Sequence, residues 1–146
     1  MSFTLRFNHL KKKLSTFPNW EEKIRYLIQL SNEKDRPSPD DIRNEKNRIK
    51  ACSQGLWLLV ETDENQKGPT CVNIFIESES KIIHALGGVF SDVISGLPLT
   101  EIKESKKTLA SFYLDLNLLE QTGRNRQNAL LALVATFIDK IDDCIK

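Results

Sequence analysis

Two neighbouring segments of this chain have the apolar patterns of β-strands, and a turn-forming stretch separates them. The first, about residues 55–61, contains the run Leu56-Trp57-Leu58-Leu59-Val60, which predicts a buried strand. The second, about 70–77, alternates Val72, Ile74 and Ile76 with other residues at the period of a strand. Because the connection Asn65-Gln66-Lys67-Gly68-Pro69 is short and typical of a turn, we expect an antiparallel pair.

Helical patterns surround this strand pair. Asn19 has the features of an N-cap, with Glu22 three residues later, and opens a helix predicted to run through about Ser31. Residues 32–48 are polar and contain two prolines, so we expect them to cross the surface. The later predicted helices are 81–94, a short one capped by Thr100, 109–119, and one that follows the polar break at 121–125.

This order of elements predicts an α+β fold, in which a small antiparallel sheet packs against several helices. The pair Gly87-Gly88 weakens its helix, so we expect close packing against a neighbouring element there. With 146 residues, 40% of them hydrophobic, the chain is long enough for one domain over 1–146, whose core needs neither disulfide nor metal.

The charge balance excludes some classes of partner. The chain has 21 Lys and Arg against 20 Asp and Glu, so no overall charge attracts nucleic acid or an anionic membrane. No apolar stretch approaches the ~20 residues of a membrane helix. The basic segment Leu10-Lys11-Lys12-Lys13-Leu14 lacks the apolar core of a secretory signal.

The three cysteines argue for a reducing cytoplasm. Cys52, Cys71 and Cys144 are an odd number, far apart, with no CxxC pair and no histidine nearby, which argues against a disulfide framework and a zinc site. Cys71 lies in the alternating strand and Cys144 near the apolar face of the last helix, so we expect both to be packing residues.

Cys52 is the candidate reactive residue. It lies among small polar residues at the junction with the first strand, and Arg48 and Lys50 precede it with no carboxylate between them. A cysteine in such a place can reach solvent and hold part of its thiolate form. The alternative is that Cys52 is one more small core residue, because free cysteines are usually buried and inert.

Five segments, in order over some 110 residues, resemble the SufE family of sulfur acceptors. Asn19-Trp20-Glu21-Glu22-Lys23 is similar to the family's opening helix, and Cys52 with Trp57 five residues later to its signature cysteine loop and strand. The other three are Glu77-Ser78-Glu79-Ser80, similar to the "SDA" loop, Gly96-Leu97-Pro98-Leu99-Thr100-Glu101-Ile102, similar to "GLTPxEI", and Leu116-Asn117-Leu118 with Arg126-Gln127-Asn128-Ala129, similar to "LGL…SRxNG".

The chain departs from the family pattern at several small residues. Ala51 stands where the family has glycine, and Gln54 replaces a serine, with Ser53 one position early. Ala85 and Ala129 replace two further glycines. Alanine allows fewer backbone conformations than glycine. The changed loop is therefore expected to limit how freely Cys52 swings out.

The resemblance implies a fold of the SufE and IscU type and a sulfur-transfer function without a cofactor or metal. Cys52 would take persulfide sulfur from a cysteine desulfurase of the SufS or CsdA type, stimulate that enzyme, and pass the sulfur to an iron–sulfur cluster assembly scaffold of the SufBCD type. The protein would be a monomer or weak homodimer, and a carrier rather than a self-sufficient enzyme.

The resemblance also assigns roles to three further residues. Arg126 matches the family's arginine and would stabilise the Cys52 thiolate or persulfide; otherwise it makes a surface or capping contact near the start of the last helix. Glu77 and Glu79 would face solvent near Cys52 and help to orient the partner.

Three alternatives stay open on the sequence. A non-catalytic adaptor would keep the fold and the partner surface without using the cysteine. A cysteine hydrolase or oxidoreductase is disfavoured, because His9 and His84 have no recognisable acid partner. A cluster scaffold of the IscU type would need several convergent thiolates, and one cysteine lies in the loop.

Overall fold

The sheet forms from the two predicted strand segments. The structure is a computed structural model that describes residues 2–34, 38–63 and 68–144. Strand β1 (Leu56–Asp63) pairs with β2 (Cys71–Ser78) in antiparallel register, from Leu56 opposite Ser78 to Asp63 opposite Cys71. The predicted alternation is confirmed, since Val72, Ile74 and Ile76 are buried and the residues between them are half-buried.

A third strand, β3 (Leu97–Pro98), pairs with the start of β2 and completes the order β1-β2-β3. The sequence pattern indicated only a helix stop at this position, because two residues are too few to show a strand period. The helices are α1 (Phe3–Leu14), α2 (Trp20–Glu33), α3 (Lys81–Ile94), α4 (Leu99–Glu104), α5 (Lys106–Ala110), α6 (Phe112–Asp115) and α7 (Arg124–Asp143).

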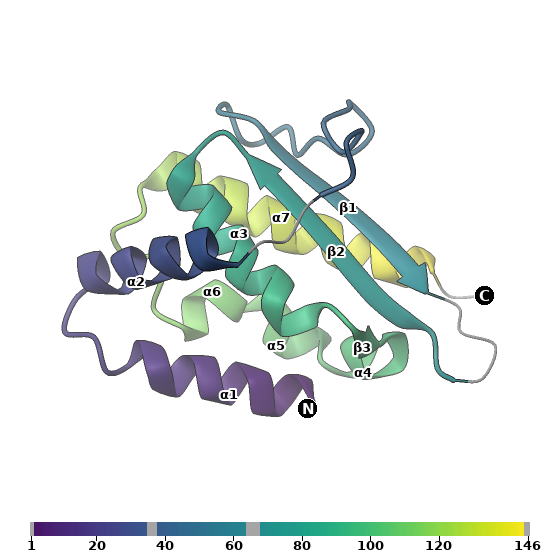
Figure 1. Cartoon of the computed structure of the whole chain (residues 1–146), viewed down its shortest axis with the longest axis horizontal. Helices are drawn as coiled ribbons and strands as arrows, with labels where there is room; N and C mark the ends of the chain where they lie inside the picture. The colour runs from purple at the N-terminus through teal and green to yellow at the C-terminus, as the bar shows by residue number, and fades with distance from the viewer. Residues whose placement is uncertain (1, 35–37, 64–67, 145–146) are drawn as a thin grey trace.

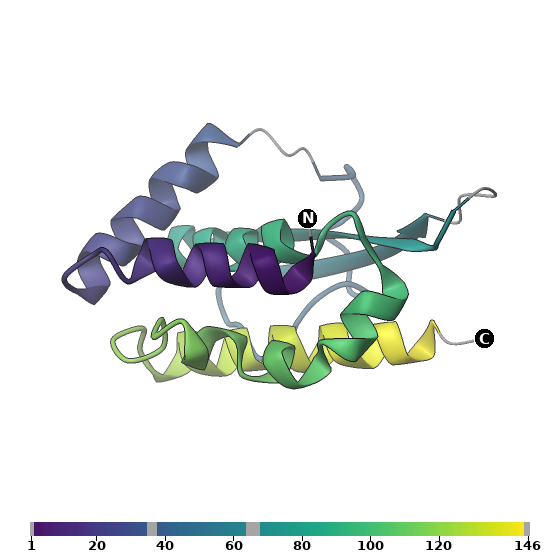
Figure 2. The same cartoon turned by 90° about the horizontal axis from the view of Figure 1, so that it is seen from below.

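The helices cover one face of the sheet, which confirms the predicted α+β fold. Figures 1 and 2 show α7 behind the strands and α3 beside β2, while among the described elements no helix lies in front of β1 and β2. The buried side chains of both strands share one core cluster with Leu130, Leu133 and Phe137 of α7. Phe90 of α3 lies at the centre of this core, edge-on to the rings of Phe112 and Phe137.

Local signals placed two helices accurately. The Asn19 side chain accepts a hydrogen bond from the Glu22 amide at 2.9 Å, so the predicted N-cap of α2 is confirmed. The predicted bounds 81–94 of α3 are also confirmed, with the Ser80 hydroxyl capping Ile83.

Other expectations were wrong. Helix α4 starts at Leu99, so Thr100 lies inside it rather than capping it. The predicted piece 109–119 is divided between α5 and α6, and Asn117 after them adopts a positive φ of 56°. Helix α1 was not predicted, because the three lysines in its last turn interrupt the apolar stripe that marks a helix. The stripe consists of Phe3, Phe7, Leu10 and Leu14, all buried.

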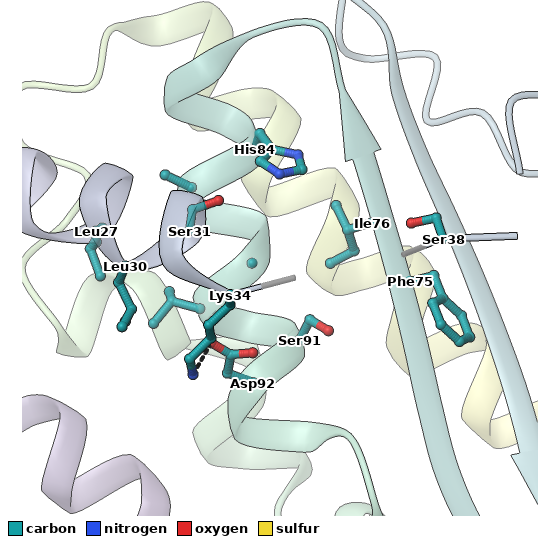
Figure 3. A pocket seen from close by; sticks show the side chains of 13 residues that line it. Leu27, Leu30, Ser31, Lys34, Ser38, Phe75, Ile76, His84, Ser91 and Asp92 are labelled. Carbon is teal, nitrogen blue, oxygen red and sulfur yellow. Dashed lines mark hydrogen bonds and ion pairs between the residues drawn. The ribbon is translucent and has the colours of Figure 1, made fainter. Parts of the chain in front are cut away.

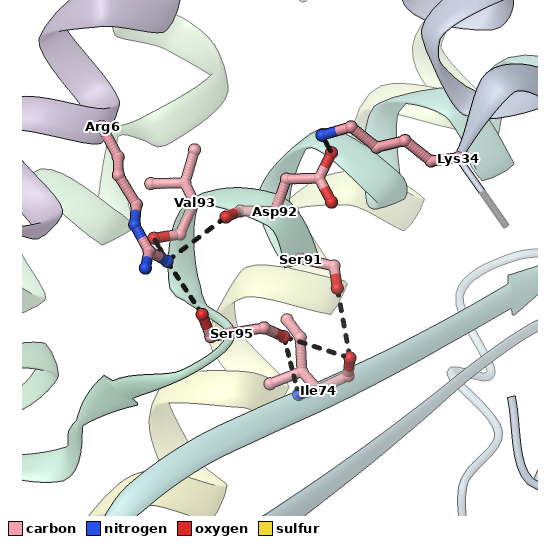
Figure 4. A network of polar contacts seen from close by, with 7 residues as sticks. All are labelled: Arg6, Lys34, Ile74, Ser91, Asp92, Val93 and Ser95. Carbon is pink, nitrogen blue, oxygen red and sulfur yellow. Dashed lines mark hydrogen bonds and ion pairs between the residues drawn. The ribbon is translucent and has the colours of Figure 1, made fainter. Parts of the chain in front are cut away.

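The C-terminal end of α3 joins three neighbouring elements (Figure 4). The Arg6 guanidinium of α1 donates to the Ser95 carbonyl at 2.8 Å, which satisfies a carbonyl at the helix end and places a cation near the negative end of the helix dipole. Lys34, just after α2, pairs with Asp92 at 2.8 Å, and the Ile74 amide of β2 donates to the Ser95 hydroxyl. These contacts anchor the C-terminal end of α3 to α1, to the residue that follows α2, and to β2.

The two adjacent glycines of α3 have different surroundings. A Cβ atom on Gly87 would lie 2.7 Å from the Ile76 Cγ2 atom, so close approach of α3 to β2 requires glycine there, as expected. A Cβ on Gly88 would meet nothing within 4 Å, so the expectation fails at that position. Gly88 instead lines a hollow between α2 and α3 (Figure 3).

Candidate functional site

Cys52 lies in a tight turn whose base is part of the sheet. The Ile49 amide donates to the Leu56 carbonyl at 2.7 Å, and the Leu58 amide donates to the Asn47 carbonyl at 2.8 Å. These two bonds extend the pairing of β1 backwards and hold both ends of the segment 50–55. The turn itself is closed by longer bonds, from the Cys52 amide to the Ile49 carbonyl at 3.2 Å and from the Gly55 amide to the Cys52 carbonyl at 3.4 Å.

The Cys52 side chain is buried, contrary to the expectation that it reaches solvent. It is 5% exposed and belongs to the core cluster, between Ile49 at 4% and Leu56 at 0%. Its neighbours Ala51, Ser53 and Gln54 are exposed, while Gly55 at the end of the turn is buried. The local sequence could not show this, because burial depends on how the turn folds back onto the core.

The cations near Cys52 in sequence are not directed at it. The Arg48 guanidinium pairs with the Glu45 carboxylate, three residues earlier in the chain, at 3.6 Å. Lys50 is exposed. The thiol of the closed turn therefore has an apolar environment rather than the cationic one expected from the sequence.

The acidic segment at the end of β2 contacts the Cys52 turn. The Ser78 hydroxyl donates to the Gly55 carbonyl at 2.7 Å and accepts from the Ser80 amide at 3.1 Å. Ser78 is buried between Glu77 and Glu79, so the turn and the two carboxylates form one corner of the molecule. The sequence places Ser78 in the acidic motif but does not predict its bond to Gly55, because the two residues lie 23 positions apart in the chain.

The two carboxylates of this corner have different surroundings. Glu79 is on the surface, with 63% of its side chain exposed, and pairs with Arg43 at 3.5 Å. The Glu77 side chain is 27% exposed and lies 3.7 Å from Nδ1 of His84. His84 therefore does have an acid neighbour, contrary to the sequence analysis. Both residues line a hollow bounded by Ile28 and Ser31 of α2.

Arg126 lies in the first turn of α7 and is half-buried. The loop before it is held by Trp20, whose Nε1 donates to the Leu118 carbonyl at 3.2 Å, and by Gln127, whose Nε2 donates to the Leu119 carbonyl at 2.6 Å. Figure 1 shows the start of α7 at the same end of the molecule as the end of β2. Within the residues that the structure describes, no hydrogen bond or ion pair joins Arg126 to Cys52.

Comparison with known proteins agrees with this construction. The family model of the Fe-S metabolism associated domain, SufE, matches residues 8–141. The chain belongs to the SufE family. Sulfur acceptor protein CsdE of Escherichia coli (strain K12) is 29% identical over 136 residues, which cover 92% of this chain and 87% of CsdE. Cysteine desulfuration protein SufE of Wigglesworthia glossinidia brevipalpis is 27% identical over 143 residues, which cover 98% of this chain and 93% of that protein.

The other two cysteines of this SufE-family chain differ from Cys52 in burial. Cys71, at the start of β2, and Cys144, at the end of α7, are both half-buried, and all three thiols are free. The order of burial is thus the reverse of the one expected from the sequence. The described residues contain no group of three or more His, Cys, Asp or Glu side chains that could hold a metal ion. None of the described helices is long and apolar enough to cross a membrane.

Proposed function

We propose that this protein accepts sulfane sulfur from a cysteine desulfurase onto Cys52, accelerates that enzyme, and delivers the sulfur to an iron–sulfur cluster assembly scaffold. The observation that carries the proposal is a single cysteine in a short turn whose base is held by backbone hydrogen bonds to β1, in a chain of the SufE family. The names of the two relatives, a sulfur acceptor and a cysteine desulfuration protein, support the same activity.

The proposed transfer needs no oxidant, metal or cofactor on this chain. The Cys52 thiolate attacks the outer sulfur of a persulfide on the desulfurase. A new sulfur–sulfur bond forms on Cys52 while the donor's bond breaks, and the donor cysteine leaves as a thiolate. The oxidation state of the transferred sulfur is unchanged. Removal of the persulfide frees the desulfurase for its next turnover, which accounts for the proposed stimulation.

The burial of Cys52 requires that the turn open during transfer, because a thiol that is 5% exposed cannot contact a cysteine of another protein. Only residues 50–55 have to move, since the bonds of Ile49 to Leu56 and of Asn47 to Leu58 hold the base. In the closed turn a Cys52 persulfide would lie away from water and from stray thiols. Opening of the turn therefore allows the sulfur to be accepted, and closing of the turn protects it until delivery.

The direct test maps the sulfur on the protein after incubation with a desulfurase and cysteine. Lys50, Lys67, Lys81 and Lys140 place the three cysteines on different tryptic peptides. Mass spectrometry should find one or more added sulfur atoms on peptide 51–67 and none on peptides 68–81 and 141–146. Sulfur on either of the latter two, with none on the first, would contradict the proposal.

Glu77 and Glu79 are proposed to orient the desulfurase, because both lie beside the Cys52 turn and Glu79 is largely exposed. Glu79→Arg should weaken the affinity for the desulfurase by about five- to ten-fold, since it removes an exposed attraction and adds a repulsion. The loss should shrink as salt is raised. Binding titrations at two salt concentrations measure it, and the melting temperature should stay nearly unchanged.

The matched control for this reversal is Glu104→Arg. Glu104 is exposed on α4, which Figure 1 places near β3 and away from the end of β2. An equal loss of affinity in both variants would point to net charge rather than docking. A lower melting temperature of Glu79→Arg without a change in affinity would make Glu79 a structural residue next to the Ser80 cap of α3.

Arg126 is proposed to stabilise the anion on Cys52 once the turn has opened. Arg126→Ala should slow sulfur acceptance by about ten-fold, the size of one charge-assisted hydrogen bond. Arg126→Lys should recover only part of this rate, because lysine keeps the charge but loses the planar fork. Single-turnover transfer rates decide the question. A lower melting temperature with an unchanged rate would leave Arg126 a role at the start of α7 only.

One observation favours the adaptor alternative, and that is the burial of Cys52 itself. A protein that stimulates the desulfurase by contact alone would have no need to open the turn. The two functions differ in whether stimulation survives the loss of the thiol.

A further inference from the structure

Three side chains from separate segments are stacked on the outside of the Cys52 turn. The Arg43 guanidinium lies over the Trp57 ring, with its Cζ atom 4.8 Å from the ring centroid. Glu79 pairs with the same guanidinium at 3.5 Å. The Trp57 ring in turn lies against Gly55, where an added Cβ would be 2.7 Å from the ring atom Cη2. The stack therefore runs from Glu79 through Arg43 and Trp57 to the last residue of the turn.

Gly55 is the residue at which this stack acts on the turn. It has a positive φ of 85°, it donates the bond that closes the turn onto the Cys52 carbonyl, and it accepts the Ser78 bond. Any opening of the turn that carries Cys52 outward has to move Gly55 relative to the Trp57 ring. The backbone of Trp57 is held in place because it belongs to β1. Its ring keeps its position against Gly55 as long as Arg43 covers it.

We infer that Arg43 and Trp57 are positioning residues that hold the Cys52 turn closed, and that Glu79 keeps Arg43 in place. The inference rests on the proposed function for the use of the exposed thiol, but the closing contacts belong to the free protein. A desulfurase that engages Glu79 with a cation of its own takes the carboxylate from Arg43. Binding of the desulfurase at the Glu79 carboxylate would then also release the Cys52 turn.

The contacts of the stack are individually weak, and this suits a turn that has to open. The Arg43 side chain is 48% exposed, so its ion pair and its contact with the ring are both partly solvated. Together they change the opening equilibrium by about five-fold. When reclosing is faster than modification, the reaction rate of a buried thiol follows the population of the open state.

The direction of the effect separates this role from stabilisation of the thiolate. If the Arg43 cation served mainly to favour the thiolate, its removal would slow the reaction of Cys52 with a thiol reagent. If Arg43 holds the turn closed, its removal accelerates the same reaction.

The experiment measures alkylation of each cysteine by iodoacetamide in the free protein, resolved by tryptic peptide. Arg43→Gln should raise the rate at Cys52 by about five-fold. Arg43→Lys should stay close to the parent, because its ammonium still reaches the ring and Glu79. Cys71 and Cys144 are internal references and should keep their rates in all variants.

Arg25→Gln is the matched control. Arg25 forms an exposed ion pair with Glu22 at 2.7 Å on α2, and its side chain is 73% exposed. It should leave the Cys52 rate unchanged. The inference is overturned if Arg43→Gln does not accelerate alkylation, or if Arg25→Gln does so equally. It is also overturned if all three cysteines accelerate together, since that reports general loosening. None of these outcomes depends on whether sulfur is transferred, so the proposed function stands or falls separately.

Discussion

Cys52→Ser is expected to abolish both sulfur acceptance and the acceleration of the desulfurase. The hydroxyl oxygen cannot take up sulfane sulfur by thiol exchange, because that reaction requires a thiolate. Peptide 51–67 should carry no added sulfur, and desulfurase turnover should fall to its rate without an acceptor. Sulfur release by the desulfurase, followed over time with each variant in excess, measures both effects.

Stability has to be separated from chemistry in this experiment. Cys52 is 5% exposed, so a serine there buries a hydroxyl and costs about 1–3 kcal/mol of unfolding free energy if the hydroxyl finds no partner. Cys52→Ala avoids this penalty and should lose activity equally. Cys71→Ser and Cys144→Ser are the matched substitutions outside the turn, and both should accept sulfur at the parent rate.

The same variants decide between the two proposed functions. If Cys52→Ser and Cys52→Ala stimulate the desulfurase as well as the parent protein, the protein is an adaptor and the turn has no part in transfer. If stimulation disappears while binding to the desulfurase persists, removal of the persulfide is the cause of stimulation.

The parts of the fold that were predictable are those specified by neighbouring residues. The alternation in β2 and the cap at Asn19 act within a few positions, so the strand pair and α2 could be read from the sequence. Helix α1 has a comparable stripe, but three consecutive lysines interrupt the apolar pattern in its last turn. Strand β3 exists only because β2 offers an edge to Leu97 and Pro98. A contact of that kind leaves no local pattern.

The candidate site shows the same division. Cys52 and the acidic segment at Glu77 and Glu79 were recognisable from spacing within short motifs. The burial of Cys52 was not, because it results from the way Ile49 and Leu56 pair beneath the turn. The position of Arg43 over Trp57 was also not predictable, since it depends on where the polar crossing after α2 returns to the sheet. An arginine in a polar surface segment carries no signal of that contact.

The stability of the frame behind the site can be probed through Tyr113, which lies beside α3 in the core. Its side chain is 2% exposed, and its hydroxyl donates to the Leu86 carbonyl at 2.7 Å. Burial raises the pKa of Tyr113 well above its usual value of about 10, because the phenolate would lose its hydration in the core. In the unfolded chain the same group ionises at its usual value.

Tyr113→Phe is therefore expected to change the alkaline limb of the stability curve. Above pH ~10 the unfolded state of the parent loses the Tyr113 proton while the folded state keeps it, so unfolding free energy falls by about 1.4 kcal/mol per pH unit. The variant loses the Leu86 hydrogen bond, which costs about 1 kcal/mol at neutral pH, but it lacks this titration. Urea unfolding over a pH series should show the variant less stable near neutrality and more stable at the alkaline end.

Tyr26→Phe, at the other tyrosine of the chain, is the matched control. Parallel curves for Tyr113→Phe and the parent would show that Tyr113 ionises equally in both states, and would remove burial as the source of alkaline sensitivity.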